Sequence, residues 1–312
     1  MEKDKLTVGI VGLGLIGGSM AVDLKRRGFA GRILGVENDS VNAAAALKIG
    51  LADEVVCFED CASRSDLIVL SVPVGTAGKM LPRVLDRFAE LSGGSGSGPG
   101  SGSDSAAGSG SGSAAGFGKI VIDVCSTKGN LVKTVAGHPM RGRYVATHPM
   151  AGTEYSGPWA AQSGLFDGRA CIICNAEDSD HDAVETVRRL YDTLNMRLTE
   201  MDAANHDVHT AYISHISHIT SFALALTVLD KERDEKHIFD LASGGFSSTV
   251  RLAKSNADMW VPILSQNRDN VLTVMDTYIE KMNEFRDAIT SGDEDRIRSL
   301  IGEANRIKRI LR

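Results

Sequence analysis

The apolar positions of this chain follow one pattern over residues 1–200 and another from residue 202 onward. In the first part, short continuous apolar runs alternate with segments of helical spacing. Continuous runs are typical of strands buried on both faces, and helical spacing is typical of the helices that cover them. The runs predict strands over 6–11, 32–36, 55–58, 67–74, 119–124, 144–147, 169–175 and 196–200. Helices are predicted over 19–27, 40–49, 76–91, 130–135 and 182–194. We therefore expect an α/β fold with a doubly wound, largely parallel sheet.

From residue 202 onward the pattern predicts helices alone: 205–229, 256–286 with an interruption at Pro262, and 294–311. The first of these helices carries small and apolar residues around much of its circumference, as a helix does when it is buried in a core or between subunits. We expect a nucleotide-binding domain over 1–200 and an all-helical substrate and dimerisation domain over 201–312, with a homodimer formed through the helices.

One segment has a composition of a different kind. Residues 92–118 are almost entirely glycine, serine and alanine, with almost nothing that could be buried. Such a composition behaves as flexible coil, and a long surface loop costs little closure entropy. We expect a flexible insertion without chemistry, either natural or an engineered connector.

The predicted strand over 6–11 runs directly into a glycine pattern, Gly12, Gly14 and Gly17, and a helix follows. Strand, G-x-G-x-x-G turn and helix together form the dinucleotide fingerprint of the Rossmann fold. The first glycine allows the sharp turn, the second lets the backbone approach a pyrophosphate, and the third allows close packing of helix and strand. The helix N-terminus then offers N–H groups to the phosphates.

Glu37 ends the second predicted strand, twenty residues after Gly17, where the fingerprint places an acid for the adenosine ribose. A carboxylate there repels a 2′-phosphate, so NAD is favoured over NADP; the alternative is a solvated carboxylate at a strand end. The segment Ser71–Pro73 should also lie beside the cofactor, because ligands bind at the carboxyl ends of parallel strands. The candidate cofactor residues are Gly12, Leu13, Gly14, Leu15, Ile16, Gly17, Glu37, Ser71, Val72 and Pro73.

Composition narrows the possible partners. The net charge of −6 leaves no basic footprint for nucleic acid or an anionic membrane. No uncharged run of 18 apolar residues indicates a membrane span, so a cytoplasmic location is expected. Cys171 and Cys174 belong to an apolar strand pattern and would point to opposite faces, which makes them small core residues and not a metal pair.

Polar residues follow two predicted strands and could do chemistry. His148 comes after the strand over 144–147, and a neutral imidazole facing a nicotinamide could take a proton as hydride leaves. Ser126, after the strand over 119–124, could bond this imidazole or the substrate. For any single histidine, the alternative is a structural residue with satisfied hydrogen bonds.

Further candidates lie in the helical part. His215 and His218 are three residues apart and share a helix face. A metal pair usually has an acid ligand nearby and this segment has none, so an anionic substrate or a subunit contact is favoured over a metal site and over a core role. Arg251 has a guanidinium suited to a bidentate grip on a carboxylate, or it forms an exposed ion pair.

Together these clusters resemble the prephenate dehydrogenase family of tyrosine biosynthesis. The matching stretches are VGLGLIGGS, DVCSTKG, HPMAGTEYSG, NHDVHTAYISHISH and GGFSSTVRLAKSNADMW. They cover both parts of the chain in order, apart from residues 92–118, and HPMAGTE-x-SG is the specific one. The resemblance implies NAD-dependent oxidative decarboxylation of prephenate to 4-hydroxyphenylpyruvate.

The resemblance also implies roles for single residues. His148 matches the histidine that bonds the substrate's ring hydroxyl, with Ser126 beside it as a second catalytic residue. Arg251 matches the arginine that binds the side-chain carboxylate. The other positions implied to line the substrate site are Thr153, Glu154, His206, His215 and His218.

Two departures from the family pattern leave the substrate open. The chain has SHISH where relatives often carry SHLPH, and Ser247 and Ser248 where many have a basic residue followed by Asp. An arogenate dehydrogenase is therefore the nearest alternative. Another two-domain dehydrogenase, which would be expected to use a lysine, and a non-catalytic NAD-binding regulator are more distant ones.

Overall fold

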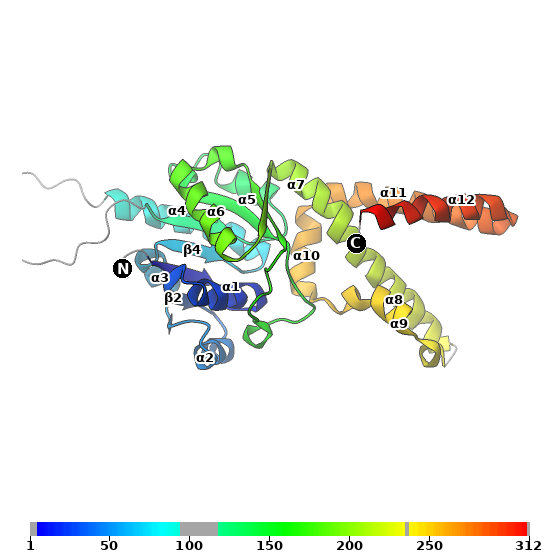
Figure 1. The fold of residues 1–312 in the computed structure, drawn as a ribbon, viewed down its shortest axis with the longest axis horizontal. Helices are drawn as coiled ribbons and strands as arrows, with labels where there is room; N and C mark the ends of the chain where they lie inside the picture. Colours follow the sequence, from blue (N-terminus) through cyan, green and yellow to red (C-terminus); the bar gives the residue numbers. More distant parts are fainter. Residues whose placement is uncertain (1–4, 94–117, 235–236, 311–312) are drawn as a thin grey trace, which may run out of the picture.

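The computed structural model describes residues 5–93, 118–234 and 237–310. Most of the segment predicted as a flexible insertion, and the last residue of the helix predicted over 294–311, lie outside these residues. The sheet-containing part and the helical part lie side by side, with α7 (Ala203–Thr210) at their junction (Figure 1).

A single eight-stranded sheet forms the first part, in the order β3-β2-β1-β4-β5-β6-β7-β8. Neighbouring strands are parallel, except that β7 runs antiparallel to β6. The first six strands have the order of the Rossmann fold, whose switch point lies between β1 and β4. The strands are β1 Leu6–Val11, β2 Ala30–Val36, β3 Glu54–Val55, β4 Leu67–Leu70, β5 Ile120–Asp123, β6 Tyr144–Pro149, β7 Ala170–Cys174 and β8 Arg197–Met201.

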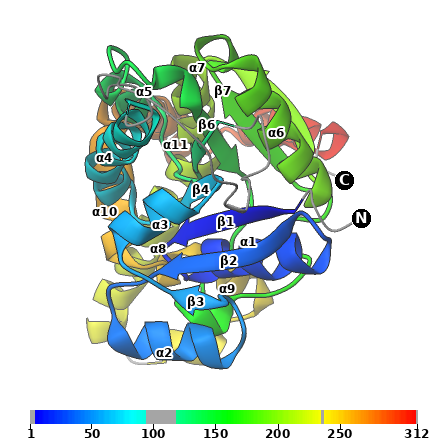
Figure 2. The same cartoon turned by 90° about the vertical axis from the view of Figure 1, so that its left-hand side faces the viewer.

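Helices cover both faces of this sheet (Figure 2). Side chains alternate between the faces: Val8 and Ile10 of β1 pack with α1 and α6, and Val11 packs with α3, α4 and α5. Because both faces of the sheet are covered, its strands are apolar on both sides. They therefore form the continuous apolar runs in the sequence from which the strands were predicted. The predicted fold class is confirmed. The helices are α1 Leu15–Arg26, α2 Ser40–Lys48, α3 Phe58–Arg64, α4 Val74–Gly93, α5 Gly129–Thr134 and α6 His181–Thr193.

Two predicted strands end three or more residues earlier than expected. β3 ends at Val55, and α3 begins at Phe58 because the Cys57 thiol accepts the Asp60 N–H and caps the helix. The strand predicted over 67–74 ends at Leu70, since α4 already begins at Val74.

The strand predicted over 144–147 is longer than expected. β6 continues to Pro149, because residues 146–149 pair with the antiparallel strand β7. His148 therefore lies within the strand and opposite Ile172, and not in the loop after it. Pairing on a strand holds its backbone more firmly than a loop would.

The second part contains helices only among its described residues, and its first helix continues from α7 through a π-helical turn at Ala211–His215 into α8 (Ile216–Asp234). The break predicted at Pro262 lies instead at Asn267, after α10 has run through the proline. Asn267 donates to the backbone oxygen of Asp207, so a contact with α7 accompanies the break. The remaining helices are α9 Gly244–Thr249, α10 Ala257–Gln266, α11 Arg268–Ser291 and α12 Glu294–Ala304.

The stretch Ala203–Arg233 is long and apolar enough to cross a membrane, judged by length and composition only. This is weak evidence, because core helices of water-soluble proteins pass the same test. Asp207 within this stretch accepts N–H groups of Lys128 and Gly129, so the start of the helix packs against the sheet-containing part. In Figure 1, α8 and the α11–α12 pair then extend away from the sheet in different directions.

Candidate active site

The glycine turn after β1 has the geometry that its spacing predicts. Gly12 has φ +93°, and a Cβ on it would lie 2.2 Å from the Ser71 oxygen at the end of β4. A Cβ on Gly17 would lie 2.1 Å from the Gly12 oxygen. Only glycine fits at these two positions, because the first has a left-handed backbone and both face backbone atoms. The turn therefore lies tightly between β1, β4 and α1.

Gly14 differs from these two glycines, because a Cβ built on it meets no atom within 4 Å. It caps α1 without a side-chain hydrogen bond, so the first N–H groups of this helix face an open space. Such a helix N-terminus attracts phosphate. The residues present thus fit a dinucleotide pyrophosphate over Gly14.

Glu37 follows β2 and turns back toward the glycine turn. Its carboxylate accepts the Leu13 N–H at 3.3 Å and the Asp39 N–H at 3.2 Å. A half-buried carboxylate held by two backbone donors fits the ribose position of the fingerprint.

The other candidate cofactor residues offer mainly backbone. The Leu13 side chain is fully buried in the core, and Leu15 and Ile16 are half-buried. The Ser71 N–H is used by the Val11 oxygen, which leaves the half-buried Val72 and the exposed Pro73 at the rim.

His148 is buried, with 7% of its surface exposed, and is bonded to a histidine from the other part of the chain. Its Nδ1 lies 2.8 Å from His206 Nε2, which comes from α7. Burial first, and then the neighbouring His206 and Lys128, hold the pKa of His148 well below its ordinary value of 6.5. The imidazole is therefore neutral near pH 7 and can accept a proton.

A fully buried charge pair supports the strand that carries His148. The Lys128 ammonium contacts the Asp123 carboxylate and donates to the Thr147 oxygen at 2.6 Å, one residue before His148. Asp123 also accepts the Tyr144 hydroxyl at 2.7 Å. Such a network holds the backbone in one arrangement, because each buried polar group needs its partner.

The helical part brings further candidates together around one tryptophan. Trp260 of α10 stacks on His218 with ring centroids 3.7 Å apart, and His215 meets the same ring edge-on at 5.8 Å. Burial lowers the pKa of His215 to about 4, and His215 Nε2 is buried without a hydrogen-bond partner among the described residues. An unpartnered polar atom of this kind is a candidate ligand contact.

Arg251 and Glu154 meet at the exposed rim, where the guanidinium lies 3.4 Å from the carboxylate. No hydrogen bond, ion pair or ring contact within residues 5–93, 118–234 and 237–310 joins this guanidinium to the imidazole of His148.

Two further candidates have no hydrogen bond to His148 among the described residues. Ser126 is half-buried in the turn after β5, and its hydroxyl has no hydrogen bond within the described part of the chain. Thr153 is exposed, and its hydroxyl accepts the Tyr155 N–H. Asp207 and Trp260 were not predicted as site residues, although they lie beside or near candidate histidines. The position of Asp207 next to His206 in NHDVHT is a signal in the sequence that could have identified it.

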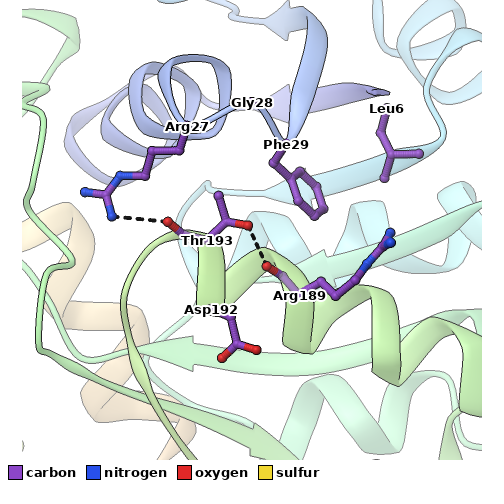
Figure 3. Close-up of a pocket in the computed structure, with 7 residues that line it drawn as sticks. All are labelled: Leu6, Arg27, Gly28, Phe29, Arg189, Asp192 and Thr193. Carbon is purple, nitrogen blue, oxygen red and sulfur yellow. Dashed lines mark hydrogen bonds between the residues drawn. The ribbon is translucent and has the colours of Figure 1, made fainter. Parts of the chain in front are cut away.

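Two cavities lie away from the glycine turn. One, of about 400 Å³, lies at the opposite end of β1, between Leu6, Phe29 and the end of α6, where Arg27 donates to the Thr193 oxygen (Figure 3). The other, of about 470 Å³, lies between β7, β8 and α7. Its lining is largely apolar and includes Met150 and His206.

Comparisons with known proteins agree with this arrangement. The family model described as "Prephenate dehydrogenase, nucleotide-binding domain" matches residues 20–90 and 114–200, and "Prephenate dehydrogenase, dimerization domain" matches 202–303. A prephenate dehydrogenase of Bacillus subtilis is 29% identical over 299 residues, which are 95% of this chain and 74% of that protein. A cyclohexadienyl dehydrogenase of Zymomonas mobilis is 25% identical, over 92% of this chain and 90% of its own.

A solved structure is similar along the whole chain. Prephenate dehydrogenase from Aquifex aeolicus, in complex with hydroxyphenyl propionate and NAD+, has a TM-score of 0.79 and 26% identity, and covers 97% of each chain. With both family models matching in order, this chain belongs to the prephenate dehydrogenase family.

Proposed function

We propose that this chain uses NAD to oxidise and decarboxylate prephenate, giving 4-hydroxyphenylpyruvate and carbon dioxide. The observation that carries the proposal is His148: a neutral, buried imidazole on β6, the third strand from the switch point, with one nitrogen already bonded to His206. Bound NAD would accept the hydride from the carbinol carbon.

The chain's own residues have three tasks in this reaction. His148 takes the hydroxyl proton as the ring carbon becomes a ketone, and returns it to the phenolate oxygen once carbon dioxide has left. General-base help of this kind contributes about 10²- to 10⁴-fold. Arg251 binds a carboxylate of the substrate, which is needed because the net charge of the chain is −6. Trp260, together with the His215 and His218 rings that contact it, excludes water from the ring of the substrate.

Glu37 supports NAD over NADP. Its carboxylate is already fixed by two backbone donors, so it cannot turn away from a 2′-phosphate without losing both hydrogen bonds. A phosphate beside this carboxylate would meet a like charge, which disfavours NADP.

Arogenate is the second candidate substrate. The relative from Zymomonas mobilis is called a cyclohexadienyl dehydrogenase, a name that leaves the side chain of the substrate open. In this chain Ser247 and Ser248 are exposed and carry no charge. They would neither attract a second carboxylate nor repel an ammonium group.

We also propose a homodimer formed through the helical part. Many apolar side chains of this part are more than 40% exposed in the single chain, which is unusual for a monomer's surface. They include Ile213, Leu226, Leu229, Val261, Tyr278, Ile279, Met282, Ile289 and Ile301. Sedimentation at micromolar concentration tests this, and a monomer there would refute it.

The deciding experiment measures NADH or NADPH formation with prephenate and arogenate, each with NAD and NADP, and with His148→Asn as the inactive control. We expect the highest kcat/KM for prephenate with NAD. A higher value for arogenate would transfer the proposal to that substrate. Binding of NAD without turnover of either acid would refute the enzyme and favour a regulator.

A further inference from the structure

Asp207 is a buried carboxylate that the reaction just described does not use. It has 7% of its surface exposed and lies on α7 beside His206. Its Oδ1 accepts the Lys128 N–H at 2.8 Å and lies 2.9 Å from His206 Nδ1, and its Oδ2 accepts the Gly129 N–H at 2.8 Å. Although burial acts to raise it, these hydrogen bonds hold the pKa of the Asp207 carboxyl below its usual range.

The ionised Asp207 carboxylate determines which nitrogen donates and which accepts in the hydrogen bonds that run from Asp207 through His206 to His148. An ionised carboxylate only accepts, so the proton between it and the ring must sit on His206 Nδ1. Burial keeps the pKa of His206 below its ordinary value, so this ring is neutral and its Nε2 carries a lone pair. The group 2.8 Å from that lone pair is His148 Nδ1, which must therefore donate.

His148 is neutral as well, so its single proton is used in this bond and its Nε2 remains unprotonated. The opposite tautomer would place the proton on Nε2, where the ring could donate but not accept. Besides His206, the charged and titratable groups that act on His148 are Lys128 and His215, and both disfavour a positive ring. Asp207 supplies a negative charge on the other side of His206, at the end of this series of hydrogen bonds.

We propose that Asp207 is a positioning residue that acts through His206: it selects the His148 tautomer whose Nε2 accepts the substrate's hydroxyl proton, and it stabilises the imidazolium that results. The proposal rests on the proposed function for its catalytic consequence, whereas the hydrogen-bonded chain Asp207–His206–His148 can be tested without turnover.

The first test is Asp207→Asn. The two backbone N–H groups cannot change direction, but His206 can move its proton to the other nitrogen. The new amide carries no charge and has one oxygen for three donors, the Lys128 and Gly129 N–H groups and His206 Nδ1, so the preference of His206 for its Nδ1–H form is weakened and a share of His148 should carry its proton on Nε2. Two-dimensional ¹⁵N–¹H NMR of histidine-labelled protein reports which nitrogen is protonated, with His148→Asn used to assign the signal. An unchanged Nδ1–H tautomer in Asp207→Asn would overturn the proposal.

Turnover gives the second readout. We expect Asp207→Asn to lower kcat by about 10²-fold or more, as the loss of an effective base does, with the Kd for NAD unchanged. Asp202→Asn is the matched control, because Asp202 is an exposed carboxylate on the N-terminus of the same helix and caps Asn205. It should keep the wild-type kcat; a loss equal to that of Asp207→Asn would count against the proposal.

A double variant separates a positioning role from a structural one. His206→Leu removes the link, so Asp207→Asn added to it should lower kcat no further. Additive losses would mean that Asp207 acts by another route. If Asp207→Asn does not fold, the same NMR measurement on His206→Leu decides the question. A His148 that stays purely Nδ1–H in that variant would show that the hydrogen bond to His206 does not select the tautomer, which would overturn the proposal. Wild-type protein with the expected tautomer but no turnover would refute the proposed function and leave the hydrogen-bonded chain intact.

Discussion

Replacing Gly14 by alanine should weaken NAD binding without destabilising the protein. Gly14 has φ −77° and ψ −156°, an extended backbone that does not need glycine. A Cβ there meets no protein atom within 4 Å, so the folded chain has room for the methyl group. The same methyl would occupy the space over the N-terminus of α1 where we place the pyrophosphate.

The size of the effect follows from packing. Forcing one extra methyl group into a well-packed contact costs about 1–3 kcal/mol. At about 1.4 kcal/mol for each tenfold change in affinity, this corresponds to a Kd for NAD raised about 5- to 150-fold. The Tm should stay the same or rise slightly, because alanine restricts the unfolded chain more than glycine does, by about 0.4–1 kcal/mol.

Two further glycines make the comparison specific. In Gly17→Ala the Cβ would lie 2.1 Å from a backbone oxygen, so both the Tm and NAD binding should fall. In Gly137→Ala the Cβ again meets nothing within 4 Å, but the residue lies in an exposed turn after α5, so neither should change. Calorimetric titration with NAD and thermal scans measure both quantities. A wild-type affinity for NAD in Gly14→Ala would refute the placement of the pyrophosphate. A large loss of Tm would refute the conclusion that the folded chain has room for a methyl group at this position.

Four other outcomes are expected. His148→Asn should lower kcat by about 10²-fold or more while the Kd for NAD stays unchanged, and a near-normal kcat would show that another group is the base. Because the pKa of His148 lies well below 6.5 and the protonated ring cannot accept, the acid limb of kcat/KM should fall below pH 6.5, whereas a limb at or above that value would contradict a depressed pKa. Arg251→Ala should raise KM for prephenate about 10- to 150-fold, the worth of a charged hydrogen bond of about 1.5–3 kcal/mol, with kcat less affected; an unchanged KM would exclude the carboxylate contact. Lys128→Met should cost about 3–5 kcal/mol of folding free energy by leaving the Asp123 carboxylate buried and unpaired, and adding Asp123→Asn should recover part of it; a loss under about 1 kcal/mol, or no recovery, would argue against a buried ion pair.

The sequence was sufficient for features that depend on neighbouring residues. The glycine turn could be predicted because its strand, glycine spacing and helix lie within one short stretch of the chain, although the close approach of Gly12 to Ser71 at the end of β4 could not. The strands could be predicted because burial on both faces leaves continuous apolar runs. Ends of elements were harder: the thiol cap of Cys57 shortened one strand, and pairing with β7 lengthened another through His148. The roles of single site residues stay predictions until they are tested.

The tertiary structure decided which distant groups meet. Nothing in the spacing of His148 and His206, 58 residues apart, shows that their rings are bonded. Nor does it show that Asp207 takes the N–H groups of Lys128 and Gly129, 79 and 78 residues away. Local patterns report the type of an element and its buried face, because these are set within a few residues. The partner of a buried polar group is set by how whole elements pack, and the proton positions in this site follow from that packing.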